Sequence, residues 1–442
     1  MSGGLKRTLG VRDLILLAVG TVIGSGVFIV PSAVLRNTGG SVSLALLVWL
    51  FAGVLSLLGA LTYGELGAMD GGSGGLYAYI RDAFGSFAAF LYGWTLFLVI
   101  SSGSVATLAV ATASYMGQLV ELSELAKKGI AVLMIVLVTW TNVRGTRQSA
   151  SVQNVTTLLK VVAILVMSAL LIAFGDAFTW SGTPAAGTEP VSLVAGVGLA
   201  MIAVLWAYEG WQYATFAVGE TIDPQRSFPR AMLIGTAALI GIYIVANVGY
   251  VVALGPTGVM SSSRVAADAV STVLGPGAAR VIAVAIIISM YSAANGLTLT
   301  APRAYYAMAR DGNFFAKMAE VHPRFGTPAF AIIASSAWAC VLAVTGTFEQ
   351  LLTYVVFVGW IFYGLGATAV FVFRRTRPSA VRPYRVPGYP VTPLLFVLSA
   401  AAIVGNTVFS QPGRAALGLS VVLVGAPAYL IWRRRRATLP TA

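Results

Sequence analysis

The sequence predicts an all-α integral membrane protein with about twelve transmembrane helices. Of its 442 residues, 58% are hydrophobic and only 10% are charged, and the mean hydropathy is +0.86. Soluble domains of this length do not have such a composition. Apolar runs of about 20 residues, the length that crosses a bilayer as a helix, recur along the whole chain. These runs lie near residues 12–35, 42–68, 84–118, 128–143, 152–174, 191–220, 231–254, 277–309, 328–346, 350–374, 391–409 and 415–433.

The distribution of basic residues predicts how these spans are oriented. The net charge of +13 could indicate nucleic-acid binding, but the basic residues fall between the spans on alternate sides. If the N-terminus is cytoplasmic, about 21 of the 28 Lys and Arg residues face the cytoplasm and about six face outward. The positive-inside rule therefore predicts a multi-pass protein of the cell membrane with both termini in the cytoplasm and no nucleic-acid partner.

The chain offers few groups for catalysis or metal binding. It has one Cys, Cys340, and one His, His322, which excludes an internal disulfide, a thiolate metal cage and a multi-histidine metal site. Paired carboxylates on one helix face at mid-membrane depth are also missing. We therefore expect no enzyme activity, no cofactor and no metal. No segment is long or polar enough for a second folded domain, so residues 1–442 are expected to form a single transmembrane domain.

The first span carries a break at its centre. Residues 20–31 read G-T-V-I-G-S-G-V-F-I-V-P, and Gly24-Ser25-Gly26 is a poor helix interior because each Gly costs about 1 kcal/mol relative to Ala. In hydrocarbon, such a break persists only where the freed backbone lines a cavity or is buried in protein. It leaves N–H groups at the start of one half-helix and C=O groups at the end of the other. These two ends suit a carboxylate and an ammonium, both of which an amino acid carries.

The sixth span, 191–220, contains a second break. Residues 206–211 read W-A-Y-E-G-W, so Glu209 and Gly210 lie mid-span between large aromatic residues. For any one of these aromatic residues, packing in the protein interior is as good an explanation as a role in a site. As a group they are more informative, because interrupted segments at corresponding positions of two halves indicate an inverted-repeat transporter with its site at the breaks.

Ionisable residues within or near the spans are the next candidates. Lys160 falls roughly 12–15 Å into its span, too deep for its side chain to reach the interface. Either it is a structural ammonium that satisfies carbonyls of the broken helix, or it stands where a coupling Na⁺ would sit and loses its proton during transport. Glu209 has three open roles: to bind a substrate amine, to carry a proton, or to cap the half-helix. Glu65 and Glu220 lie near helix ends and are expected to pair with a loop Arg such as Arg230 or Arg303.

At these residues the chain resembles the amino acid–polyamine–organocation (APC) transporter family, and within it the bacterial relatives of the L-type amino acid transporters. The resemblance covers nearly the whole chain. Besides residues 20–31, its landmarks are L-T-Y-G-E-L-G (61–67), S-G-G-L-Y-A-Y-I (73–80), L-W-A-Y-E-G-W (205–211), D-P-Q-R-S-F-P-R-A (223–231), R-A-Y-Y-A-M-A-R-D-G (303–312) and H-P-R-F-G-T-P (322–328). It implies a leucine-transporter-type fold with discontinuous helices 1 and 6. The inverted five-helix repeats would span about 12–174 and 191–374, followed by two additional helices at about 391–433.

The resemblance also implies the site residues. On the first helix, Gly24, Ser25 and Gly26 would offer amides to a substrate carboxylate, and carbonyls of Val22 and Ile23 would receive the amine. Carbonyls of Trp206 and Glu209 would share that role, and Trp206 would close the site from the outer side. Lys160 would reach the first helix near Gly20 in place of a sodium ion. The remaining pocket or gate candidates are Ala207, Tyr208, Tyr213 and Asn295.

The functional prediction is a sodium-independent amino acid transporter, an exchanger or facilitator, for neutral L-amino acids. The alternatives are a proton-coupled symporter that uses Glu209 or Lys160, and a cationic amino acid or polyamine transporter in which Glu209 pairs with the substrate charge. A non-transporting receptor is a further hypothesis. Animal L-type transporters are bonded to a glycoprotein partner through a Cys between spans 3 and 4. Residues 119–127 contain no Cys here, so we expect no disulfide-linked partner.

Overall fold

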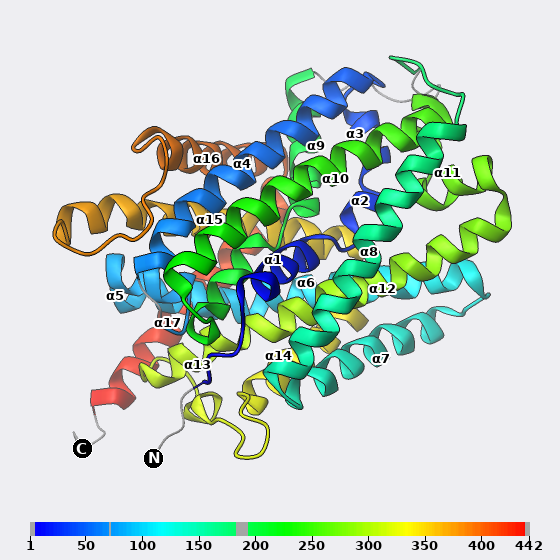
Figure 1. Cartoon of the computed structure of the whole chain (residues 1–442). Helices are drawn as coiled ribbons and strands as arrows, with labels where there is room; N and C mark the ends of the chain where they lie inside the picture. The colour runs from blue at the N-terminus through cyan, green and yellow to red at the C-terminus, as the bar shows by residue number, and fades with distance from the viewer. Residues whose placement is uncertain (1–4, 70–71, 183–192, 438–442) are drawn as a thin grey trace.

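The computed structural model describes residues 5–69, 72–182 and 193–437, which fold into a bundle of helices (Figure 1). In the first half the elements are α1 (Val11–Val22), α2 (Gly26–Ile29), α3 (Pro31–Asn37), α4 (Val42–Met69), α5 (Leu76–Thr95), η1 (Leu96–Ile100), α6 (Ser101–Leu119), α7 (Glu124–Val143) and α8 (Thr146–Phe174). Next come α9 (Leu193–Ala207), η2 (Trp211–Glu220), α10 (Pro224–Ser261), α11 (Val265–Leu274), α12 (Pro276–Thr300) and α13 (Pro302–Arg310). The last are η3 (Ala316–Ala319), α14 (Ala329–Thr345), α15 (Phe348–Thr376), α16 (Val391–Ser410) and α17 (Pro412–Ala437).

The predicted membrane spans correspond to helices. Eleven helical stretches in the described residues are long and apolar enough to cross a membrane. The shorter apolar helix α14, with 17 residues, falls on the remaining predicted span at 328–346. The all-α class and the discontinuity of the first and sixth spans are therefore confirmed.

Several helices extend beyond the apolar runs that predicted them. The run at 152–174 is the apolar part of α8, which begins at Thr146. The run at 231–254 lies inside α10, which begins at Pro224 and changes direction at Gly255, where φ is +66°. Apolar composition marks only the part of a helix that lies in hydrocarbon. The polar turns beyond it continue the backbone hydrogen bonding, and their sequence gives a weaker signal.

Helix α1 lies inside the bundle and contacts α8, α10, α12 and η2. Figure 1 shows the long helices α4 and α10 running side by side, with α10 packed against α1. Outer helices such as α7 and α17 present exposed apolar side chains, including Leu133 and Leu423. In a membrane protein these side chains face lipid, because hydrocarbon solvates them as well as a protein core does. The half-helices of the first span therefore lie where polar backbone is shielded from lipid.

At the end of the bundle where α1 begins, the chain before α1 is fastened to the end of η2. The amides of Thr8 and Leu9 donate to the carbonyl oxygen of Glu220 at 2.8 and 3.0 Å, and Ile222 N–H donates to Leu9 at 2.8 Å. The last turns of α17 lie toward this same end (Figure 1). We call it the N-terminal end of the bundle.

Two buried carboxylates at this end have arginine partners. Glu220 pairs with Arg303, as expected, at 2.8 Å between Nε and Oε2, and both side chains are buried. Glu65 pairs with Arg374 at 2.7 Å and lies 3.4 Å from Arg382. The two arginines named as examples from the sequence are therefore not the partners of Glu65, because the last turn of α15 supplies Arg374 and the connector after it supplies Arg382.

Candidate functional site

The first helix break lies between α1 and α2. Helix α1 ends at Val22, Ile23 has extended backbone with φ −72° and ψ 90°, and α2 begins at Gly26. The amides of Gly24 and Ser25 donate no backbone hydrogen bond within the described residues, and Gly26 opens a new helix whose first N–H groups have no partner in the helix itself. The Ser25 hydroxyl is buried, also without a partner among the described residues. This break therefore presents a group of unused donors.

The second break lies between α9 and η2. Helix α9 ends at Ala207, and the turn through Tyr208 and Glu209 closes with a hydrogen bond of 3.0 Å from Glu209 N–H to the carbonyl of Trp206. Gly210 has φ +130°, a backbone conformation that favours glycine because it has no Cβ. The chain then continues as η2 from Trp211.

The two breaks are in contact. A Cβ added at Gly26 would lie 2.6 Å from Cβ of Ala207, and a Cβ at Gly210 would lie 2.9 Å from the carbonyl carbon of Thr21. The hydroxyl of Tyr243, on α10, donates to the carbonyl oxygen of Ala207 at 2.8 Å and lies 3.3 Å from that of Val22. One tyrosine thus links the end of each half-helix, and two glycines allow the backbones to approach.

A small cavity of about 20 Å³ lies between the breaks. Six of the predicted site residues line it: Val22, Gly24, Ser25, Gly26, Trp206 and Glu209. Four lining residues were not predicted: Thr21, Ser104, Leu108 and Leu297. Thr21 lies within the first motif, but small and apolar residues like the other three occur throughout spans 84–118 and 277–309. No local signal distinguishes them, because only packing brings α6 and α12 to the breaks.

Glu209 is held by neutral donors at the edge of this cavity. Its Oε1 accepts hydrogen bonds of 2.5 Å from Nε2 of Gln212 and 2.5 Å from the hydroxyl of Tyr363. Gln212 in turn accepts from the amide of Gly210 at 3.2 Å, which stabilises the turn. In the described residues Glu209 forms no ion pair with a basic side chain, and it is 8% exposed. A carboxylate with this environment is available to a cationic group or to a proton.

Lys160 reaches the first break from α8. Its Nζ donates to the carbonyl oxygens of Gly20 and Ile23, each at 2.5 Å, and lies 3.4 Å from that of Ser289. The Ser289 hydroxyl also lies 3.1 Å from the Ile23 carbonyl. The side chain of Lys160 is 2% exposed. A buried ammonium therefore binds the carbonyl end of α1, and the Ile23 carbonyl is used by the protein itself.

The other predicted site residues lie outside the cavity. Tyr208 packs against the rings of Trp49 and Tyr243, with centroids 6.1 and 4.9 Å away. Tyr213 lies on η2 and contacts Phe216. Asn295 belongs to a polar network behind the site. Its amide accepts from Asn142 and Ser149 at 2.9 and 3.2 Å and donates to Gln153 at 3.0 Å.

Comparison with known proteins identifies the family. The model of a family described as amino acid permease matches residues 9–426. The chain belongs to this family. It is 32% identical over 441 residues to the serine/threonine exchanger SteT of Bacillus subtilis (strain 168), covering 98% of this chain and 99% of the relative. It is 31% identical over 441 residues to the human large neutral amino acids transporter small subunit 2, covering 97% of this chain and 82% of the relative. It is 33% identical over 416 residues to the human b(0,+)-type amino acid transporter 1, covering 92% of this chain and 84% of the relative.

The cavity of this permease is closed in the present conformation. A volume of about 20 Å³ holds about one water molecule. An amino acid needs several times that volume, so it enters only if the walls move. Trp206, Leu108 and Leu297, which are 6%, 3% and 3% exposed, are the largest apolar side chains on those walls. Binding of an amino acid in this cavity would therefore require a change of conformation.

Proposed function

We propose that this permease is a sodium-independent exchanger of neutral L-amino acids. It works by alternating access in the cell membrane, with both termini in the cytoplasm. The proposed sodium independence rests on the buried ammonium of Lys160, whose Nζ lies 2.5 Å from each of two carbonyl oxygens of the first break. Carbonyls of an unwound helix are the ligands that a coupling cation takes in transporters with broken helices. A cation attached to α8 occupies such a position permanently, so none is needed from solution.

The backbone groups of the substrate bind to the two breaks. The amides of residues 24–26 and the Ser25 hydroxyl donate to the carboxylate, for which the positive end of the half-helix is also favourable. The ammonium binds to carbonyl oxygens of Val22, Trp206 and Glu209. Ile23 is left out of this set, because its carbonyl already accepts from Lys160. These contacts select the α-amino acid class and leave side-chain selectivity to the cavity walls.

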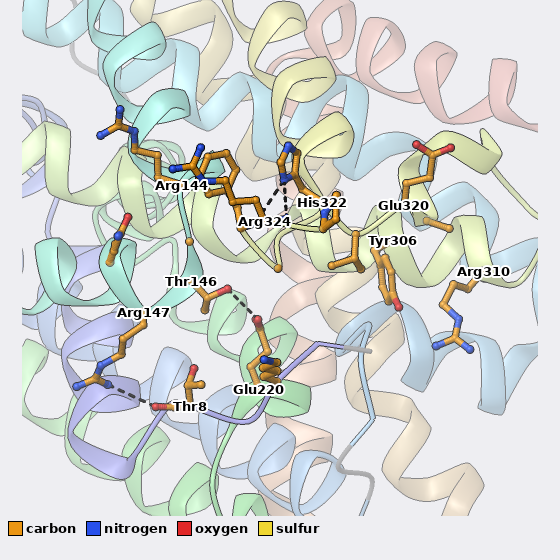
Figure 2. Close-up of a pocket in the computed structure, with 18 residues that line it drawn as sticks. Thr8, Arg144, Thr146, Arg147, Glu220, Tyr306, Arg310, Glu320, His322 and Arg324 are labelled. Atoms are coloured by element: carbon orange, nitrogen blue, oxygen red, sulfur yellow. Dashed lines mark hydrogen bonds between the residues drawn. The ribbon is translucent and has the colours of Figure 1, made fainter. Parts of the chain in front are cut away.

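Movement of the two ends of the bundle gives access from alternate sides. Trp206 closes the cavity toward the outside. Toward the cytoplasm the path is closed by the buried pair of Arg303 and Glu220. Thr146 on α8 joins this pair, donating to Oε1 of Glu220 at 3.0 Å (Figure 2). Release to the cytoplasm therefore requires α8, η2 and the chain before α1 to separate.

Small and medium neutral side chains are the preferred substrates. The cavity wall combines the hydroxyls of Ser25 and Ser104 with the apolar Leu108 and Leu297, so it accepts both a short polar and a short aliphatic group. Two of the relatives named above are described as a serine/threonine exchanger and as a large neutral amino acids transporter small subunit. We therefore expect serine, threonine and aliphatic amino acids to compete for one site.

A second candidate function follows from Glu209. Its carboxylate is buried, faces the cavity and is bound by neutral donors rather than by a basic side chain of the described residues. Such a group accepts a cationic substrate side chain or a proton. Cationic amino acid transport and proton-coupled symport are therefore the functions to test against neutral exchange.

The proposal includes the assembly and the internal symmetry of the chain. The loop between α6 and α7 contains no Cys, and Cys340 lies on α14, so the permease acts without a disulfide-linked partner. The breaks at residues 23–25 and 208–210 occupy equivalent places in repeats at about 12–174 and 191–374, with α16 and α17 as the two additional helices. Equivalent broken helices meeting at one site support this arrangement.

Uptake of labelled L-serine into liposomes that contain the purified permease tests the proposal. The vesicles are empty or preloaded with L-serine, with and without sodium and an inward proton gradient. An exchanger takes up label only into preloaded vesicles and is unaffected by sodium. Uptake into empty vesicles driven by protons would replace exchange with symport, and competition by L-lysine but not by L-leucine would favour the cationic function. A requirement for sodium would contradict the role given to Lys160.

A further inference from the structure

A second, much larger cavity lies at the N-terminal end of the bundle and shares no lining residue with the cavity between the breaks. Its volume is about 930 Å³. Figure 2 shows its lining side chains, which come from the chain before α1, the first turn of α8, the end of η2, helix α13 and residues 319–326. The cavity lies next to the buried ion pair of Arg303 and Glu220. Glu220 forms part of the cavity wall.

The wall of this cavity carries an excess of positive charge. Five basic residues line it, against two carboxylates, Glu220 and Glu320. Glu220 is already neutralised by a buried arginine that is not part of the wall. The basic residues are Lys6, Arg144, Arg147, Arg310 and Arg324.

Three of the four guanidinium groups rest on aromatic rings rather than on carboxylates of the described residues. Arg144 lies 3.9 Å from the ring centroid of Trp140, Arg310 lies 5.9 Å from that of Tyr306, and Arg324 lies 5.5 Å from that of Phe325. Stacking holds a guanidinium in place and leaves its N–H edge available for an anion. The charge is therefore positioned without being neutralised.

The first turn of α8 adds backbone donors to the same wall. Its N-cap is Gly145, which has no side chain to bond the first amides, and residues 145–148 line the cavity. The first N–H groups of a helix have no partner in the helix, and the helix dipole makes this end favourable for negative charge. Together with the arginines, they form a site suited to a phosphate group.

One side of the cavity borders the lipid-facing surface. Helix α7 exposes Leu133, Leu137 and Trp140, 56%, 47% and 56% exposed, on one face at intervals of about one turn. That face ends at Arg144, stacked on Trp140 at the mouth of the cavity. Trp and Arg in this arrangement are typical of the headgroup level of a bilayer. A lipid with its chains along α7 would place its headgroup at the basic wall.

We propose that this cavity binds the phosphate headgroup of an anionic phospholipid of the cytoplasmic leaflet, whose acyl chains lie along the exposed face of α7. The site rests on the proposed cytoplasmic position of this end, but not on the identity of the transported substrate. Arg147 connects it to the transport machinery, since its Nη1 contacts Asp13 of α1 at 3.0 Å and the carbonyl of Thr8 at 3.4 Å. A bound headgroup therefore holds together α8, α1 and the preceding chain, which must separate for release to the cytoplasm.

Native mass spectrometry of the full-length permease tests the site directly. The probes are dioleoylphosphatidylglycerol, dioleoylphosphatidylcholine and inorganic phosphate, each titrated into delipidated protein. The test variant is Arg144→Gln/Arg324→Gln, whose guanidinium groups lie over rings and form no ion pair in the described residues. The matched control is Arg226→Gln/Arg230→Gln, which removes two exposed charges from the start of α10, outside the cavity.

The wild type is expected to bind phosphatidylglycerol more tightly than phosphatidylcholine. The test variant should bind phosphatidylglycerol about 30-fold more weakly, since each Lys or Arg near an anionic lipid contributes roughly fivefold, while the control stays near the wild-type value. Equal loss in both double variants, or no loss in the test variant, would overturn the proposal. Tight binding of inorganic phosphate that displaces the lipid would assign the cavity to a soluble anion, and equal binding of the two lipids would remove the role of charge.

Discussion

At the first helix break the freed carbonyls are bound by a buried cation, whereas at the second break a buried carboxylate is held by neutral donors. Lys160 belongs to α8 and reaches across to α1, so it joins two helices through charge. Glu209 belongs to the second break itself, and Gln212 and Tyr363 satisfy only one of its two oxygens. The comparison indicates that the first break is fixed electrostatically, while the second keeps a carboxylate that can interact with the substrate. The four predictions below test that difference.

Lys160→Met is expected to have the largest effect. It removes the donor from two buried carbonyls, each of which then costs about 1–3 kcal/mol as an unsatisfied group, so we expect uptake to fall by about 100-fold. Uptake of labelled serine into preloaded liposomes measures the loss. Lys128→Met is the control, since Lys128 is exposed on α7. Unchanged uptake in Lys160→Met would show that the first break is not fixed by charge.

Gly210→Ala and Gly26→Ala compare the backbones of the two breaks. At Gly210 the methyl meets the Thr21 backbone, and φ of +130° costs a non-glycine residue about 1–3 kcal/mol. At Gly26 φ is not positive, so the methyl group meets a steric contact without backbone strain, with Cα and Cβ of Ala207 at 2.5 and 2.6 Å.

We therefore expect a lower melting temperature for both glycine variants, with the larger drop for Gly210→Ala. Gly241→Ala on α10 is the control, because nothing lies within 4 Å of its added Cβ and the change should stabilise by about 0.4–1 kcal/mol. Melting temperatures of the purified variants decide the order. Equal stability of Gly210→Ala and Gly241→Ala would contradict the contact between the breaks.

Tyr363→Phe tests how strongly the second break holds its carboxylate. The variant loses one hydrogen bond to a charged acceptor, worth about 1.5–3 kcal/mol, and should raise the KM for serine about tenfold as Glu209 becomes free to move. Tyr250→Phe is the control, since the Tyr250 hydroxyl is buried without a hydrogen-bond partner in the described residues. If both variants transport alike, the bond from Tyr363 has no bearing on the site.

Glu209→Gln is expected to have the smallest effect on neutral substrates. The amide oxygen still accepts from Gln212 and Tyr363, and hydrogen bonds to a neutral acceptor are weaker by about 1 kcal/mol, so serine uptake should fall by about fivefold or less. Competition by L-lysine and any dependence on a proton gradient should disappear in this variant, whereas Glu121→Gln, at an exposed site, should keep the wild-type pattern. Loss of all serine uptake would mean that the negative charge is required for the neutral substrate.

The sequence predicted the places of the two breaks well, because glycine and acidic residues inside an apolar run conflict with a buried helix. Gly24 to Gly26 and Glu209 to Gly210 are visible for that reason. Leu108 and Leu297 line the same cavity and gave no signal, since each is an ordinary residue of its span. Conversely, Tyr208 and Tyr213 were implied by the resemblance, yet neither is among the residues that line the cavity, and their rings pack against Trp49 and Phe216.

Composition and local pattern by themselves determined the all-α membrane class, the number of spans and the two interrupted helices, because hydrocarbon imposes its length and hydrogen-bonding demands on every segment separately. Tertiary structure alone decided which carbonyls Lys160 binds, which neutral donors hold Glu209, which arginine pairs with Glu65, and that five basic residues from separate segments enclose one cavity. Those contacts join residues far apart in the chain, and they depend on the packing of whole helices, which no local stretch of sequence specifies.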